Sequence, residues 1–163
     1  MKWLCSPHLP EASNLGNLIY GIMIGKYLIS GPVTPALVAS LTEELGKEVY
    51  SGGHSIFLGQ VRADVIDGKV VRAIEYSAYD SMVDYEAGSI INSVLGEFGD
   101  ANSIRIIHSS GIVRAGEISL LVLVSAGHRK HAIEACAKTV ELIKEKLPVW
   151  KKEIYDDESH TWK

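Results

Sequence analysis

The sequence predicts an α+β domain with a mainly antiparallel sheet and three helices. Three observations support this fold class. Short turns join the strand-like segments, one of these turns is an Asp-Gly pair, and helical patterns separate the hairpins. The resulting order of helix, hairpin, helix, hairpin, helix and tail contains no linker and no internal repeat, which favours a single domain.

The first helix and the first hairpin have clear boundary signals. Thr34 can cap free backbone N–H groups, and the proline that follows it suits the first helical position. Apolar residues then recur along one face, and Gly46 is expected to end this helix in a left-handed conformation. Residues 55–62 predict a strand, and Asp67-Gly68 predicts a type I′ turn before a returning strand.

The second half of the chain repeats this alternation. Residues 81–98 predict a helix closed by a glycine, and residues 104–113 predict a strand. The next strand, residues 118–124, is apolar throughout and is therefore expected to be buried on both faces. A third helix is predicted over residues 129–146 and should end before Pro148, which leaves the remaining residues as a tail.

The composition excludes several classes of protein. The chain has 163 residues, of which 47% are hydrophobic and 22% charged, as expected for one globular domain. Sixteen basic residues against 20 acidic residues give a net charge of −4, which argues against a non-specific nucleic-acid binder. Cys5 and Cys136 cannot form a disulfide framework, so we expect a reducing compartment such as the cytoplasm.

The first residues of the chain do not resemble the rest. Their apolar residues are interrupted by asparagine and glycine, and no run approaches the roughly 20 residues of a membrane-spanning helix. No small-residue cleavage site indicates a secretory signal. We therefore expect residues 1–28 to form an extension, poorly ordered or translated from upstream of the true start, and residues 29–163 to form the domain.

Charge is distributed unevenly along the chain. Residues 127–152 contain seven basic and three acidic residues, so this segment carries +4 and the rest of the chain carries −8. A focused anion site would explain this pattern, because the local potential steers a ligand. A solvated helix face with ion pairs between neighbouring turns would explain it equally well.

Individual residues in this segment suggest chemistry. Lys144 lies at the edge of the apolar stripe, where partial burial would lower its pKa, although a lysine covering apolar surface would occupy the same position. His128 and Arg129 lie where a strand ends and a helix begins, an arrangement that binds phosphate. His131 is three residues further on, but no cysteine or nearby carboxylate completes a metal site, so no metal is expected.

Cys136 lies on the apolar stripe and is expected to be inert. Surface or packing roles are assigned to the remaining histidines: His8, His54, His108 and His160.

Four segments together resemble a known family. They are residues 57–62 (FLGQVR), 74–79 (IEYSAY), 124–129 (VSAGHR) and 143–153 (IKEKLPVWKKE). In this order and spacing they are similar to the signature segments of the large (catalytic) subunit of molybdopterin synthase. The resemblance covers residues 29–162 and implies an α/β-hammerhead fold.

The resemblance also implies an activity and partners. Enzymes of this family convert cyclic pyranopterin monophosphate into molybdopterin by installing the two dithiolene sulfurs. The sulfur arrives as a thiocarboxylate on the C-terminal Gly-Gly of a small ubiquitin-like partner subunit. Two large subunits form a homodimer at the centre of a heterotetramer, and the resemblance implies no cofactor, nucleic acid or membrane.

Site residues follow from the matched positions. The resemblance makes Lys144 and Lys151 the catalytic residues, and it makes His128 and Arg129 a pair that reaches the pocket across the dimer interface. The full set of implied substrate-binding residues is Phe57, Gln60, Val61, Arg62, His128, Arg129, Lys144, Lys151, Lys152 and Glu153. A non-catalytic module that binds an acidic tail or RNA, and an inactive scaffold for the small subunit, are the alternatives.

Overall fold

The computed structural model describes residues 27–163, and the expectations for residues 1–26 lie outside this part of the chain. Strand β1 (Leu28–Ser30) pairs in parallel with the strand that contains His108, and Leu28 is fully buried. Tyr27 is also buried in the main hydrophobic core. The folded part of the chain thus includes Tyr27 and Leu28, two residues that the sequence pattern placed in the extension.

The sheet is antiparallel apart from β1. The remaining strands are β2 (Gly53–Gln60), β3 (Val65–Ile66), β4 (Lys69–Ala78), β5 (Ala101–Arg114), β6 (Ile118–Ala126), β7 (Val149–Tyr155) and β8 (His160–Trp162). Their order is β2-β6-β5-β4-β7-β8, with β1 beside β5 and β3 beside β4. Strand β2 therefore pairs with β6, and the hairpin predicted at Asp67-Gly68 is formed by β3 and β4.

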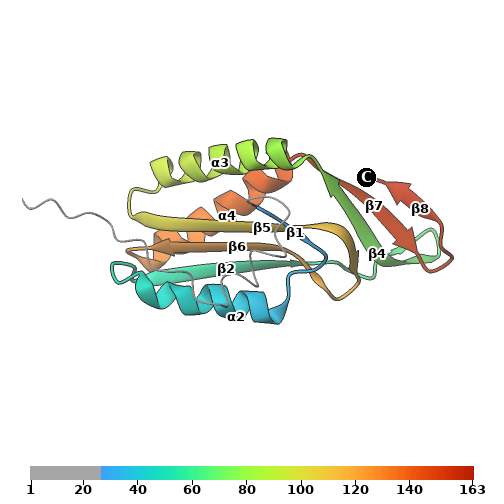
Figure 1. Ribbon diagram of the computed structural model, residues 1–163, viewed down its shortest axis with the longest axis horizontal. Coiled ribbons are helices and arrows are strands. Elements are labelled where there is room, and N and C mark those ends of the chain that lie inside the picture. The colour runs from blue at the N-terminus through green and yellow to red at the C-terminus, as the bar shows by residue number, and fades with distance from the viewer. Residues whose placement is uncertain (1–26) are drawn as a thin grey trace, which may run out of the picture.

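Within residues 27–163, three α-helices cover the sheet, as the sequence predicts. They are α2 (Pro35–Glu44), α3 (Asp80–Glu97) and α4 (Arg129–Lys146), and a short 3₁₀ helix, η1 (Leu45–Lys47), follows α2. Helices α3 and α4 lie on one face of the sheet and α2 lies on the other (Figure 1). Within residues 27–163, no helix is both long and apolar enough to cross a membrane.

Strand β6 explains how the layers are held together. Val122 and Val124 pack in the core under α3 and α4, whereas Leu121 and Leu123 pack in the core under α2. All four side chains are at most 1% exposed. Successive side chains of a strand point to opposite faces, so a strand covered on both faces must be apolar throughout. This confirms the burial predicted from the sequence.

The predicted boundaries of α2 are confirmed at one end and wrong at the other. The Thr34 hydroxyl oxygen accepts a hydrogen bond from the Leu37 N–H at 3.2 Å, as expected for an N-cap. Gly46 has no left-handed backbone, because the chain continues into η1 after the last turn of α2. The type I′ turn is confirmed, since Asp67 and Gly68 have φ values of 51° and 78°.

The segment after Pro148 is not an irregular tail. It forms the hairpin β7–β8, and β7 adds to the sheet beside β4 over most of its length. Asp157 lies in the turn of this hairpin, 2.8 Å from the Lys69 ammonium, and it also accepts hydrogen bonds from Ser159. The hydrogen bond from Lys69 and those from Ser159 lower the pKa of Asp157 to about 2. The turn is thus tied to the start of β4 by an exposed ion pair.

Candidate functional site

A cavity of about 760 Å³ lies where the C-terminal end of α4 meets strands β2, β4, β5 and β7. Seven of the ten residues implied by the sequence line it: Phe57, Gln60, Val61, Arg62, Lys144, Lys151 and Glu153. They come from β2 and the loop after it, from the last turn of α4, and from β7. This volume is within the range of small-molecule sites.

Strand β2 and the residue that follows it supply the apolar side of this cavity. Phe57 is half-buried and packs against the main core, while Val61 is 2% exposed. The register of β2 against β6 shifts between Gly59 and Gln60, which is the signature of a β-bulge. Such a bulge ends regular pairing and re-aims the residues after it. Gln60 and the residues that follow it are thereby placed at the rim of the cavity.

The charged groups of the cavity are partly neutralised in pairs. Arg62 forms an exposed ion pair with Asp64 at 2.7 Å, and the Lys163 ammonium lies 3.5 Å from the Glu153 carboxylate. Glu153 also accepts a hydrogen bond from a tyrosine hydroxyl. Among the described residues, Lys151 has no ion-pair partner. Its ammonium is therefore available to a bound anion.

Lys144 projects from the last turn of α4. Its side chain is 63% exposed and its ammonium lies 3.8 Å from the Glu141 carboxylate. The partial burial expected for Lys144 from the sequence amounts to about a third of the side chain in the single chain. An exposed ion pair of this length contributes little stability, about 0–1 kcal/mol, so an incoming anion can replace Glu141 at low cost.

Lys152 does not line the cavity. Neighbouring residues of a strand face opposite sides, so Lys151 and Glu153 face the cavity while Lys152 faces away. Its ammonium forms an ion pair with Glu75 of β4 and lies 5.5 Å from the ring centroid of Trp162. Lys152 thus links β7 to both neighbouring strands.

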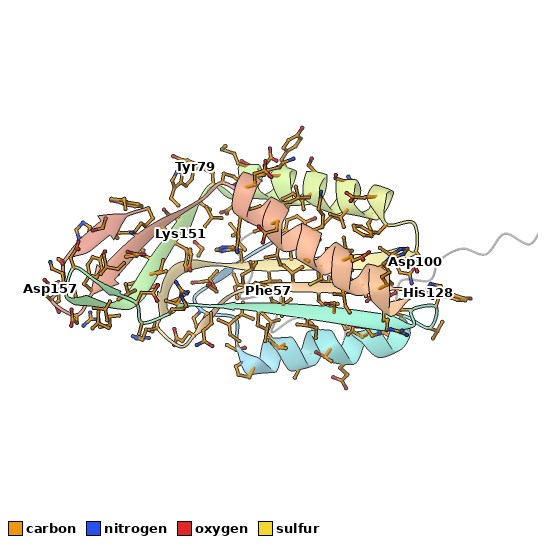
Figure 2. The ribbon with its side chains drawn as sticks, turned by 180° about the vertical axis from the view of Figure 1, so that it is seen from behind. Phe57, Tyr79, Asp100, His128, Lys151 and Asp157 are labelled. Atoms are coloured by element: carbon orange, nitrogen blue, oxygen red, sulfur yellow. The ribbon has the colours of Figure 1, made fainter. Side chains whose placement is uncertain are left out.

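His128 and Arg129 lie at the opposite end of the molecule. Figure 2 shows His128 beside Asp100 at one end of the molecule, Phe57 near the middle and Lys151 toward the other end. Helix α4 begins at Arg129 and has 18 residues, which at about 1.5 Å per residue makes it about 27 Å long. The cavity lies at the other end of this helix, so neither side chain reaches it within one chain.

A carboxylate lies beside His128 and His131, although the sequence predicts none near them. The Nδ1 of His128 lies 2.7 Å from one oxygen of Asp100, and the Nδ1 of His131 forms a short hydrogen bond to the other. These hydrogen bonds lower the pKa of Asp100, and the bond from His128 has the larger effect. No set of three His, Cys, Asp or Glu side chains in residues 27–163 is arranged to hold a metal ion. No local sequence signal links Asp100 to residues 28 and 31 positions further on.

His108 is a cavity residue that the sequence interpretation missed. It lines the cavity from β5 and is 6% exposed. His108 is therefore a buried residue that also borders the cavity, and not a surface residue or a packing residue alone. A signal was present in the sequence, because Ile104, Ile106 and His108 alternate with the period of a strand. A polar residue in an otherwise apolar series of this kind marks a buried group that needs a partner.

The fold and the cavity define a single-domain α+β protein that gathers lysine, arginine and histidine side chains around a space suited to an anionic small molecule. Residues 32–146 match the family model described as MoaE protein. The chain belongs to this family, the catalytic subunits of molybdopterin synthase. It is therefore an enzyme subunit with a role in molybdenum cofactor biosynthesis.

Individual relatives agree with this assignment. The molybdopterin synthase catalytic subunit of Dictyostelium discoideum is 41% identical over 115 residues, covering 69% of this chain and 72% of that protein. The one from Pyrococcus abyssi is 43% identical over 107 residues, covering 66% and 71%. The crystal structure of molybdopterin synthase from Staphylococcus aureus is 28% identical with a TM-score of 0.72, covering 86% of this chain and 98% of that chain. The α+β fold predicted from the sequence is thereby confirmed.

Proposed function

We propose that this chain transfers sulfur from the C-terminal thiocarboxylate of a small ubiquitin-like partner to cyclic pyranopterin monophosphate, forming the dithiolene of molybdopterin. The observation that carries this proposal is the convergence of Arg62, Lys144 and Lys151 on one cavity with an apolar wall. Both reactants are anions, and a cationic pocket that holds them together removes much of the entropic barrier to their meeting. Family membership supports the same reaction.

Each cation has a role that matches its surroundings. Lys151, which has no ion-pair partner in the described part of the chain, stabilises the incoming thiocarboxylate and the oxyanion that develops from it. Lys144 moves the proton and stabilises charge as the sulfur attacks the side-chain carbon of the pterin. Arg62 exchanges its exposed partner Asp64 for the phosphate, to which a guanidinium can bind in bidentate fashion.

The other residues shape the pocket. Phe57 and Val61 form an apolar wall for the pterin ring, and Gln60 offers an amide at the rim. Glu153 balances part of the positive charge. Lys152 acts indirectly, because its ion pair with the neighbouring strand β4 fixes the position of β7 and hence of the two residues that face the cavity.

Two copies of the chain are needed for a complete site. His128 and Arg129 are separated from the cavity by the length of α4, so we infer that they serve the cavity of a second copy in a homodimer. The small subunit would bind at each cavity, which gives a heterotetramer. A solved complex of subunits 1 and 2 of the Helicobacter pylori molybdopterin-converting factor has the same fold, at 20% identity and a TM-score of 0.69, and supports a two-subunit assembly. We place this assembly in the cytoplasm.

Reconstitution tests the proposed reaction. The protein is mixed with a thiocarboxylated small subunit and cyclic pyranopterin monophosphate, and molybdopterin is measured; the same subunit with an ordinary carboxylate is the control. Lys144→Ala should lower turnover by about 100-fold or more, because a positioned acid or base contributes about 100- to 10,000-fold. Lys146→Ala, two residues along the same helix and outside the cavity lining, should leave turnover unchanged.

Two results would overturn the proposal. Salt-sensitive binding of the small subunit without any pterin product would show a non-catalytic binding module. Wild-type turnover by Lys144→Ala would remove this lysine from the reaction. Formation of molybdopterin only with the thiocarboxylated subunit, together with the loss in Lys144→Ala and not in Lys146→Ala, is the expected outcome.

A further inference from the structure

His108 is held rigidly in the wall of the cavity. Its ring meets that of Tyr76 edge to face, with 5.1 Å between the centroids, and both residues are at most 6% exposed. The Tyr76 hydroxyl donates a hydrogen bond to the Ser119 hydroxyl at 3.1 Å. The backbone N–H of His108 also donates to the Tyr27 carbonyl oxygen at 2.8 Å. The imidazole is thus held between the Tyr76 ring of β4 and the backbone of its own strand, β5.

The hydrogen bond of the ring determines which nitrogen carries the proton. Nδ1 lies 2.8 Å from the Ser109 carbonyl oxygen, and because a carbonyl oxygen can only accept, Nδ1 is the donor. Burial, with a contribution from the positive charge of Lys151, holds the pKa of His108 below its usual value. The ring is then neutral and its lone pair lies on Nε2. Within residues 27–163, Nε2 has no hydrogen-bond partner.

The remaining cavity groups are poor proton acceptors. Lys144, Lys151 and Arg62 are cations, Asp64 is paired with Arg62, and Glu153 is occupied by its lysine and tyrosine partners. His108 is therefore the neutral base of this cavity, and it lies close enough to Lys151 for the positive charge of the lysine to lower its pKa.

The proposed function contains a step that needs such a base. When the thiocarboxylate sulfur attacks the pterin carbon, a carbon–sulfur bond forms and a carbon–oxygen bond of that carbon breaks, and the oxygen leaves with the proton that Lys144 supplies. The partner's C-terminal glycine is then joined to the pterin through a thioester. Release of the partner requires water to attack the carbonyl carbon, after which the carbon–sulfur bond of the thioester breaks. The partner leaves as a carboxylic acid and the sulfur stays on the pterin carbon as a thiol, so one water is consumed and no oxidant or reductant is needed.

We propose that Nε2 of His108 accepts the proton of the water that hydrolyses this thioester and then returns it to the departing sulfur. The Lys151 ammonium stabilises the oxyanion formed at the carbonyl carbon. This inference rests on the proposed function, and it divides the work of the cavity: Lys144 serves the formation of the carbon–sulfur bond, and His108 serves the release of the partner.

A single-turnover experiment tests this division. His108→Asn keeps a side-chain N–H near the position of Nδ1, which can still donate to the Ser109 carbonyl oxygen, and it removes Nε2. With a thiocarboxylated small subunit and cyclic pyranopterin monophosphate, intact-protein mass spectrometry should show the partner–pterin thioester accumulating. Its breakdown should be slower by about 100-fold or more, while its formation remains near the wild-type rate. His160→Asn, which makes the same change at an exposed histidine outside the cavity lining, is the matched control and should break the thioester down at the wild-type rate.

Other outcomes would overturn the assignment. Wild-type breakdown in His108→Asn would show that His108 is not the base. An equal loss in formation and breakdown, in folded protein, would show a merely structural role. His108→Gln removes the base by a second route, so a folding defect in one variant does not decide the question. Failure of the proposed function is distinguishable, because the wild-type protein would then form neither thioester nor molybdopterin.

Discussion

The length of α4 leads to a quantitative prediction about mixed dimers. Arg129 opens this helix and Lys144 lies 15 positions further on, in its last turn, so the two are about 22 Å apart along the axis. If each cavity takes its lysine from one copy and its arginine from the other, Arg129→Ala and Lys144→Ala can complement each other. In a mixed dimer of these two variants one cavity is intact and the other carries both lesions.

The mixed dimer should therefore have about half of the wild-type turnover, because a symmetric homodimer contains two equivalent sites. The two variants are co-expressed with different affinity tags, and the mixed dimer is isolated by purification on both tags in sequence. Each variant alone, carried through the same steps, should show only residual molybdopterin formation. A mixed dimer as inactive as the parent variants would refute the reasoning, since it would mean that both residues act within one chain.

Three further predictions concern stability. Thr34→Ala removes the N-cap of α2 and should lower the free energy of unfolding by about 1 kcal/mol, measured by urea denaturation. Gly52→Ala places a Cβ against the Gly127 carbonyl oxygen and should cost about 1–3 kcal/mol, whereas Gly46→Ala, which meets open space, should cost nothing; equal effects would contradict the packing argument. Asp157 has a pKa of about 2, below its ordinary value of 3.8, so its contribution to stability is present above pH 4 and is lost as the pH falls through 2. The Asp157→Asn variant should therefore have a lower free energy of unfolding than wild type at pH 7. This difference should disappear when both proteins are titrated to acid pH.

The sequence predicts those elements whose own pattern determines their structure. Helix α4 occupies residues 129–146 as expected, because an apolar stripe, a terminal proline and the absence of internal breakers define it locally. The sequence does not predict strands β7 and β8, because β7 carries three consecutive charged residues and β8 has only three residues, all of them exposed. Pairing with β4 makes β7 a strand, and such pairing has no local signature.

The same distinction applies to the site. Residues in family-like segments could be predicted to act together, and seven of them share a cavity. The hydrogen bonds of Asp100 could not be predicted, because the position of Asp100 beside His128 and His131 depends on where β5 begins relative to the end of β6. His108 could have been found from strand periodicity, but its hydrogen bond to Ser109 and its contact with Tyr76 required the folded arrangement.

The position of β2 has a consequence for synthesis on the ribosome. Strand β2 pairs only with β6 in the described sheet, and roughly 60 residues of chain must be made between the end of one and the start of the other. At about 5–20 residues per second, β2 waits on the order of 3–12 seconds for its partner. During that time Ile56, Phe57 and Leu58 form an apolar segment with unpaired backbone groups, the kind of segment that chaperones bind and that aggregates when synthesis stalls.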